Sequence, residues 1–68
     1  MAGAPRELDV VRLDGPVSGW PAGSEGTVVE DFGSEGMIEF DDGKRSDLIV
    51  VPYSSVSVVW SARRGRRP

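Results

Sequence analysis

The sequence contains no cysteine and no histidine, and its only lysine is Lys44. Without cysteine or histidine the chain can form neither disulfides nor the usual zinc sites, so its stability must come from an apolar core. No apolar run approaches the roughly 18 residues that a membrane-spanning helix requires. We therefore expect a soluble, cytoplasmic protein that has no membrane segment, no metal and no other cofactor.

Groups for catalysis are also scarce. Serines and carboxylates are present, but there is no histidine or cysteine to complete a nucleophile and its base. The repeated "GSEG" is not followed by the Gly-Lys-Ser/Thr of a phosphate loop. The acidic "DDGKRSD" lacks the ligand spacing of a calcium loop. We expect neither catalytic residues nor a metal site, and hence a protein that is not an enzyme.

Charge is unevenly distributed along the chain. Residues 1–60 carry four basic side chains against all eleven acidic ones, a formal charge of −7, whereas 61–68 carry four arginines. A short end of like charge that contains glycine and proline is most simply a disordered, solubilising terminus. The alternative is that this end contacts the phosphates of a nucleic acid. The residues that would do so are Arg63, Arg64, Arg66 and Arg67.

Apolar residues occur in five short runs rich in valine, which predict strands rather than helices. The runs cover residues 7–13, 26–32, 37–40, 47–51 and 56–60. The glycines between them would each cost about 1 kcal/mol inside a helix. Phe32 and Phe40 are the only phenylalanines, and we expect both in the core.

Turn residues separate the five runs. Asp42-Gly43 is a strong signal for a tight hairpin, and the spacing of Gly33 and Gly36 predicts another of three to four residues. Pro52 ends the fourth run, and the three residues after it match one turn of 3₁₀-helix. The connection over residues 14–25, with two prolines and three glycines, is the one long loop. We assign structural turns to Gly23, Gly26, Gly36 and Gly43.

The predicted elements follow the order of an SH3-like barrel: a strand, a long loop, a three-stranded meander, a 3₁₀ turn and a final strand. Barrel closure limits the free sheet edges of a small protein. We therefore expect an all-β, five-stranded SH3-like barrel over residues 7–60. It lies between a flexible N-terminus over 1–6 and a disordered basic tail over 61–68.

Four segments together resemble one small bacterial family. "ELDVVRL", "WPAGSEGTVVEDF", "MIEFDDGK" and "VPYSSVSVV" are similar to the DUF4926 family across residues 7–59. The resemblance implies the barrel fold and a bacterial origin, and it implies no activity, because the family is itself of unknown function. Gly23, Gly26 and Val28 also form a "GxxGxV" pattern that is loosely similar to the KOW motif. KOW modules that bind RNA surround these glycines with basic residues, whereas here the neighbours are acidic.

Three aromatic residues are the candidates for binding a partner, because tryptophan and tyrosine are frequent interface anchors. Trp20 lies in the long loop, Tyr53 at the 3₁₀ turn and Trp60 at the end of the last strand. Trp20 allows two interpretations, an exposed groove residue beside Tyr53 or a lid packed on the open end of the barrel. We expect a protein-interaction module, monomeric or weakly dimeric, whose acidic body binds a basic protein. The alternative is a KOW-like, nucleic-acid-associated module that uses the arginine-rich tail.

Overall fold

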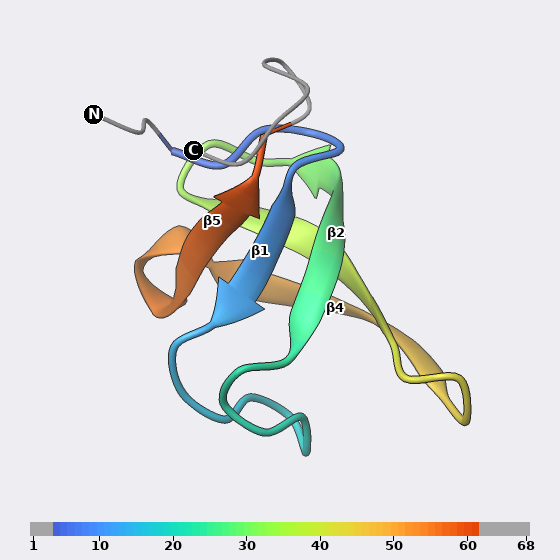
Figure 1. Cartoon of the computed structure of the whole chain (residues 1–68). Helices are drawn as coiled ribbons and strands as arrows, with labels where there is room; N and C mark the ends of the chain where they lie inside the picture. Colours follow the sequence, from blue (N-terminus) through green and yellow to red (C-terminus); the bar gives the residue numbers. More distant parts are fainter. Residues whose placement is uncertain (1–3, 62–68) are drawn as a thin grey trace.

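A computed structural model describes residues 4–61, and these form five β-strands and one 3₁₀ turn (Figure 1). The strands belong to a single antiparallel sheet in the order β4-β3-β2-β1-β5. This is the strand order of an SH3-like barrel, and the 3₁₀ turn precedes the last strand as predicted, so the predicted fold is confirmed. The elements are β1 (Val10–Leu13), β2 (Glu25–Asp31), β3 (Glu35–Asp41), β4 (Ser46–Pro52), η1 (Tyr53–Ser55) and β5 (Val56–Trp60).

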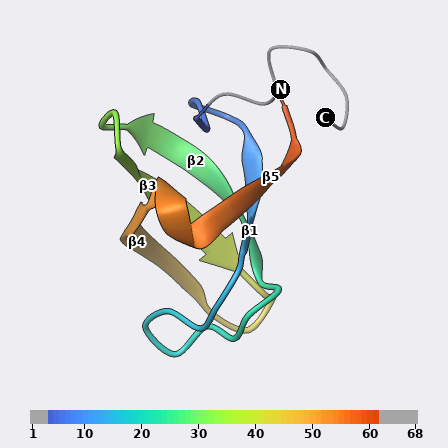
Figure 2. The same cartoon turned by 90° about the vertical axis from the view of Figure 1, so that its left-hand side faces the viewer.

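The sheet curls so that β5, β1 and β2 lie across from β3 and β4 (Figures 1 and 2). The curl depends on β2, which pairs with β1 through its first half and with β3 along its length. An irregularity between Val28 and Glu30 places Val29 outside the regular register with β3. A β-bulge of this kind bends its strand and increases the local twist. The bend lets one strand serve both halves of the barrel.

Every second residue of the strands points into the barrel, as the period of two requires. The buried apolar residues come from all five strands and from the long loop, and Trp20 is the loop's contribution. Phe32 is 48% exposed, so its predicted place in the core is wrong. It follows the last residue of β2, where the chain is already turning towards β3. The core consists of Val11, Leu13, Trp20, Val28, Ile38, Phe40, Val51 and Val56.

Two of the four glycines predicted to form turns do so. Gly23 and Gly43 have φ angles of 89° and 87°, which favour glycine. Gly43 lies in the connection between β3 and β4, where the Asp42 amide donates to the Arg45 carbonyl at 3.2 Å. The connection between β2 and β3 is also tight, since the Phe32 amide donates to the Glu35 carbonyl at 2.9 Å.

Gly26 and Gly36 lie within β2 and β3, so their assignment to turns is wrong. Both are buried, and both are glycine because another side chain occupies the space of a Cβ. A Cβ on Gly26 would lie 2.6 Å from a methyl of Ile38, and one on Gly36 would lie 2.5 Å from the Tyr53 hydroxyl. The predicted hairpin is present, because only residues 32–34 separate β2 from β3, but of its two glycines only Gly33 lies in the connection.

The chain before β1 is folded against the barrel. Pro5, which the sequence placed in the flexible N-terminus, is buried. The Arg6 amide donates to the Asp9 carboxylate at 3.0 Å, and the Leu8 amide donates to the Val28 carbonyl at 2.7 Å. Leu8 has a φ of 72° and is 63% exposed, so a turn replaces the first part of the strand predicted from residue 7. No helix within residues 4–61 has the length and apolar character to cross a membrane.

Candidate functional site

The long loop folds its tryptophan back onto the barrel. Val17 and Trp20 exchange two backbone hydrogen bonds of 2.9 and 2.8 Å around the turn at Ser18 and Gly19. Both turn residues have positive φ, 49° and 85°, as in the hairpin turns that match the natural twist of strands. This small hairpin inside the loop directs the indole towards the core.

The indole of Trp20 then makes three contacts. Its ring lies 5.5 Å from that of Phe40, centroid to centroid, and its Nε1 donates to Asp47 Oδ2 at 2.8 Å. The guanidinium carbon of Arg45 lies 4.3 Å from the ring centroid, and Arg45 Nε lies 3.4 Å from the same Asp47 oxygen. Trp20 is only 4% exposed, so it is a lid packed on the barrel and not an exposed groove residue. An indole buried in this way supports the barrel and is not an exposed anchor.

Tyr53 occupies a second, separate environment. The η1 turn lays its ring against Gly36, and its hydroxyl donates to Asp31 Oδ1 at 3.0 Å. Burial, followed by the hydrogen bond and charge of Asp31, raises the pKa of Tyr53 to about 12. The pKa of Asp31 is lowered, first by the Gly33 amide that donates to it and then by Tyr53. The polar end of Tyr53 is therefore engaged inside the domain.

Trp60 lies at the end of β5, opposite Val10 of β1, and is partly buried. Trp20 and Tyr53 both pack on the core, but they donate to different carboxylates, Asp47 and Asp31. Binding of a partner by Tyr53 and Trp60 stays a prediction. The four arginines predicted as nucleic-acid contacts lie outside the described residues.

The acids of the β3–β4 hairpin organise the turn itself. Asp41 accepts the Gly43 amide at 2.8 Å, and Asp42 accepts the amides of Lys44 and Arg45 at 2.8 and 2.9 Å. These donated hydrogen bonds lower the pKa of Asp42, because they favour its charged form. Among residues 4–61, no group of three or more acidic side chains is arranged to hold a metal ion.

The outer face of β2, β3 and β4 carries a set of apolar side chains, of which Val29, Leu48 and Val50 are exposed and Met37 is half-buried. The register places Met37 of β3 between Glu30 of β2 and Val50 of β4, and it places Glu39 next to Leu48. Leu48 is 61% exposed and Val50 is 46% exposed. Strand positions that face solvent usually carry polar residues instead. We call this set, which consists of Val29, Met37, Leu48 and Val50, the apolar stripe.

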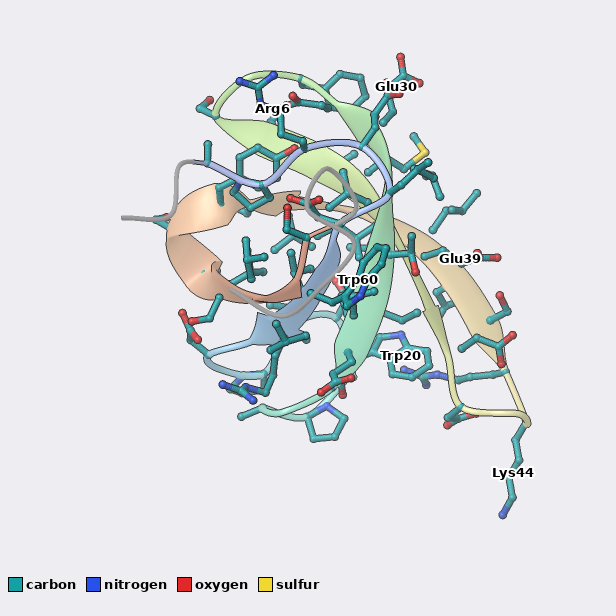
Figure 3. All side chains as sticks on the ribbon, turned by 45° about the horizontal axis from the view of Figure 1, so that its top comes forward. Arg6, Trp20, Glu30, Glu39, Lys44 and Trp60 are labelled. Atoms are coloured by element: carbon teal, nitrogen blue, oxygen red, sulfur yellow. The ribbon has the colours of Figure 1, made fainter. Side chains whose placement is uncertain are left out.

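The charges beside the apolar stripe are all negative. Exposed acidic residues on the outer face of the same three strands are Glu25, Glu30, Glu35, Glu39 and Asp41. The basic side chains of the described chain lie elsewhere, on β1, before it, or in the β3–β4 turn. Figure 3 shows Glu30 and Glu39 pointing outward, with Lys44 at the far end of the hairpin. The outer face therefore combines apolar surface with an excess of negative charge.

Sequence reasoning based on aromatic residues missed this surface, although the sequence contains a signal for it. The run "DLIVV" has no polar residue between Leu48 and Val51, where a strand with one solvated face would alternate. Continuous apolar runs are typical of strands that are covered on both faces. In the barrel, Ile49 and Val51 face inward, and the other side of β4 is uncovered.

Fold and side-chain placement together define a small all-β barrel domain. Trp20 is buried against its core, and its exposed apolar side chains are surrounded by acidic ones. Comparisons with protein-family models, with curated proteins and with solved structures find no match to this chain. The resemblance to the DUF4926 family stays a prediction.

Proposed function

We propose that the domain is a non-catalytic protein-interaction module that binds a basic protein partner. The observation that carries this proposal is the outer face of β2–β4, where exposed apolar side chains lie among acidic ones. A contiguous exposed apolar patch rimmed by polar groups is typical of an interaction site. The resemblance to DUF4926 and the absence of cysteine support placing the module in the bacterial cytoplasm.

Electrostatics favour a basic partner over a nucleic acid. Residues 4–61 contain eleven acidic and four basic side chains, a formal charge of −7. A negative field of this kind attracts basic surfaces and repels a phosphate backbone. Binding through the outer face should therefore weaken as salt screens the acidic side chains.

The test is affinity capture from a nuclease-treated lysate, followed by mass spectrometry. The bait is the full chain, beside a truncation to residues 1–60 and a full-length double variant, Glu30→Lys with Glu39→Lys. Glu7→Lys is the control, because it repeats the charge change of each single substitution at an exposed residue outside the strands. Each bait is first checked by circular dichroism for the folded barrel.

We expect a basic protein to be retained by the full chain, the truncation and the control, and to be lost with the double variant. A parallel capture without nuclease treatment tests the KOW-like alternative, which recovery of nucleic acid by the full chain but not by the truncation would support. A protein that binds the double variant as well as the original chain would contradict the role of the outer face.

A further inference from the structure

We infer that β4 accepts an extended basic peptide as an added sixth strand, with long cationic side chains lying across the apolar stripe. This inference rests on the proposed function and names the form of the partner. β4 is at one edge of the sheet, and its seven residues pair with β3 on one side only. An edge strand presents unpaired backbone donors and acceptors, to which an extended peptide can hydrogen-bond.

β4 lacks most of the features that protect an edge strand against pairing. Protected edges carry lysine, proline, a bulge or an inward-pointing charge, or they are very short. Asp47 is one such charge near the start of β4, where it is bonded to Trp20 and Arg45. From Leu48 to Val51 there is no charged residue, no proline and no irregularity in the register with β3, and Pro52 comes only at the end. Figure 2 shows β4 next to β3 at the margin of the barrel. The uninterrupted apolar sequence of this strand therefore suits a strand that is paired on both sides.

The neighbouring acids specify the charge of the added strand. A strand beside β4 would lie about 10 Å from β3, which is two strand spacings. Lysine and arginine can lay their apolar stems on apolar surface while the charged end remains in water. On such a strand, stems that pass over Leu48 would bring cationic ends to Glu39, its partner in the register. Stems that pass over Val50 would point towards Glu30, which lies beyond Met37. A peptide with basic side chains at alternate positions fits this arrangement.

A second copy of the chain is a poorer occupant on the same grounds. Its own β4 would bring an identical apolar edge, but each copy would also bring the acids of its outer face. Like charges brought together across an interface oppose association. The arginine-rich residues 61–68 would supply the opposite charge, and a truncated chain tests whether they occupy the surface.

The probe is a synthetic peptide of about eight residues, matched to the length of β4, in which lysine alternates with valine or threonine. Its affinity is measured by fluorescence anisotropy, and its position by amide shifts in nuclear magnetic resonance spectra. A peptide with glutamate in place of lysine is the charge control. Two further peptides are N-methylated at alternate amides, one at the odd and one at the even positions.

Strand addition predicts saturable binding with shifts centred on residues 46–52, and loss of binding for only one of the two methylated peptides. That asymmetry arises because alternate residues of an added strand direct their amides towards β4. Leu48→Lys and Glu39→Lys should each weaken binding by about tenfold, and Glu7→Lys should not. If truncation to residues 1–60 strengthens binding at the same site, the occupant in the free protein is the chain's own basic end, which overturns our assignment to a separate partner.

Two other results overturn the inference in different ways. Binding that is lost in Glu39→Lys but is equal for both methylated peptides would reject strand addition and leave the acidic interaction surface intact. Failure of the unmethylated lysine peptide to bind the folded chain would reject strand addition, while capture of a basic protein could still establish the proposed function.

Discussion

The indole nitrogen of Trp20 donates a 2.8 Å hydrogen bond to Asp47, 27 positions further along the chain. This bond joins the long loop to the second residue of β4. Arg45, in the turn before that strand, packs over the indole ring. It explains how a loop containing several glycines and prolines can hold a fixed aromatic lid.

Trp20→Phe should retain the packing against Phe40 and remove the donor to Asp47. We expect a loss of about 1 kcal/mol in the free energy of unfolding, the typical contribution of one hydrogen bond. Chemical denaturation of Trp20→Phe, Asp47→Ala and the double variant measures the coupling between the two residues. Additive effects in this cycle would show that the hydrogen bond contributes nothing to stability.

Tyr53 should make the domain sensitive to alkaline pH. Its pKa in the folded state is about 12, against an ordinary value of 10, so folding favours the neutral phenol. The resulting stability is fully present below pH 10 and is lost as the pH rises from 10 towards 12. Because Tyr53 is the only tyrosine, the ultraviolet absorbance of tyrosinate reports on it alone. Tyr53→Phe should lack this alkaline loss of stability, and an absorbance midpoint near pH 10 in the folded protein would contradict the prediction.

Gly36→Ala should destabilise the barrel by about 1–3 kcal/mol, the usual range for inserting a methyl into a packed site. The added Cβ would lie 2.5 Å from the Tyr53 hydroxyl and 2.8 Å from a ring carbon, so the ring must move. Thermal unfolding provides the measurement. Gly15→Ala is the control, because nothing lies within 4 Å of its Cβ position and its φ is not positive. We expect the control to be neutral or slightly stabilising, and equal losses in both variants would refute the steric explanation.

Leu48 and Val51 lie on opposite faces of the same strand. Substitutions at the two residues therefore distinguish a role in binding from a role in folding stability. Leu48→Ser should change the free energy of unfolding by no more than about 0.5 kcal/mol, as is usual for an exposed position. Val51→Ala, at a residue with no exposed surface, should destabilise by about 1–3 kcal/mol. Parallel denaturation curves test this contrast. A large loss in Leu48→Ser would mean that the apolar stripe has a structural role in the isolated domain.

The strands and the barrel could be predicted because short apolar runs between turn residues leave few alternatives to an antiparallel meander. Local signals also located the tight turn at Gly43 and the η1 turn after Pro52. The sequence could not show that Gly36 lies under Tyr53, since that contact joins segments that no local pattern relates. The prediction that Phe32 lies in the core was wrong for a similar reason. A phenylalanine at the end of an apolar run resembles a core residue until the end of β2 is known.

The two interpretations of Trp20 could be separated only by three-dimensional structure, because both fit a tryptophan between glycine and proline. Its partners Phe40, Arg45 and Asp47 come from a distant hairpin, and nothing near Trp20 in the sequence identifies them. The exposed apolar side chains of the outer face could have been predicted, because the run in β4 does not alternate with polar residues. The aromatic residues gave no indication of this surface.

The strand order also has a consequence for how the chain folds. β2, β3 and β4 are neighbours in both sequence and space, so their hairpins close over short loops, whereas β5 must find β1 across more than forty residues. Local contacts form faster than distant ones, because closing a long loop loses more chain entropy. We expect the meander to form the folding nucleus and the docking of β5 on β1 to be the last step. On the ribosome, that step must wait until the residues of β5 have emerged, and until then β1 has no second neighbour.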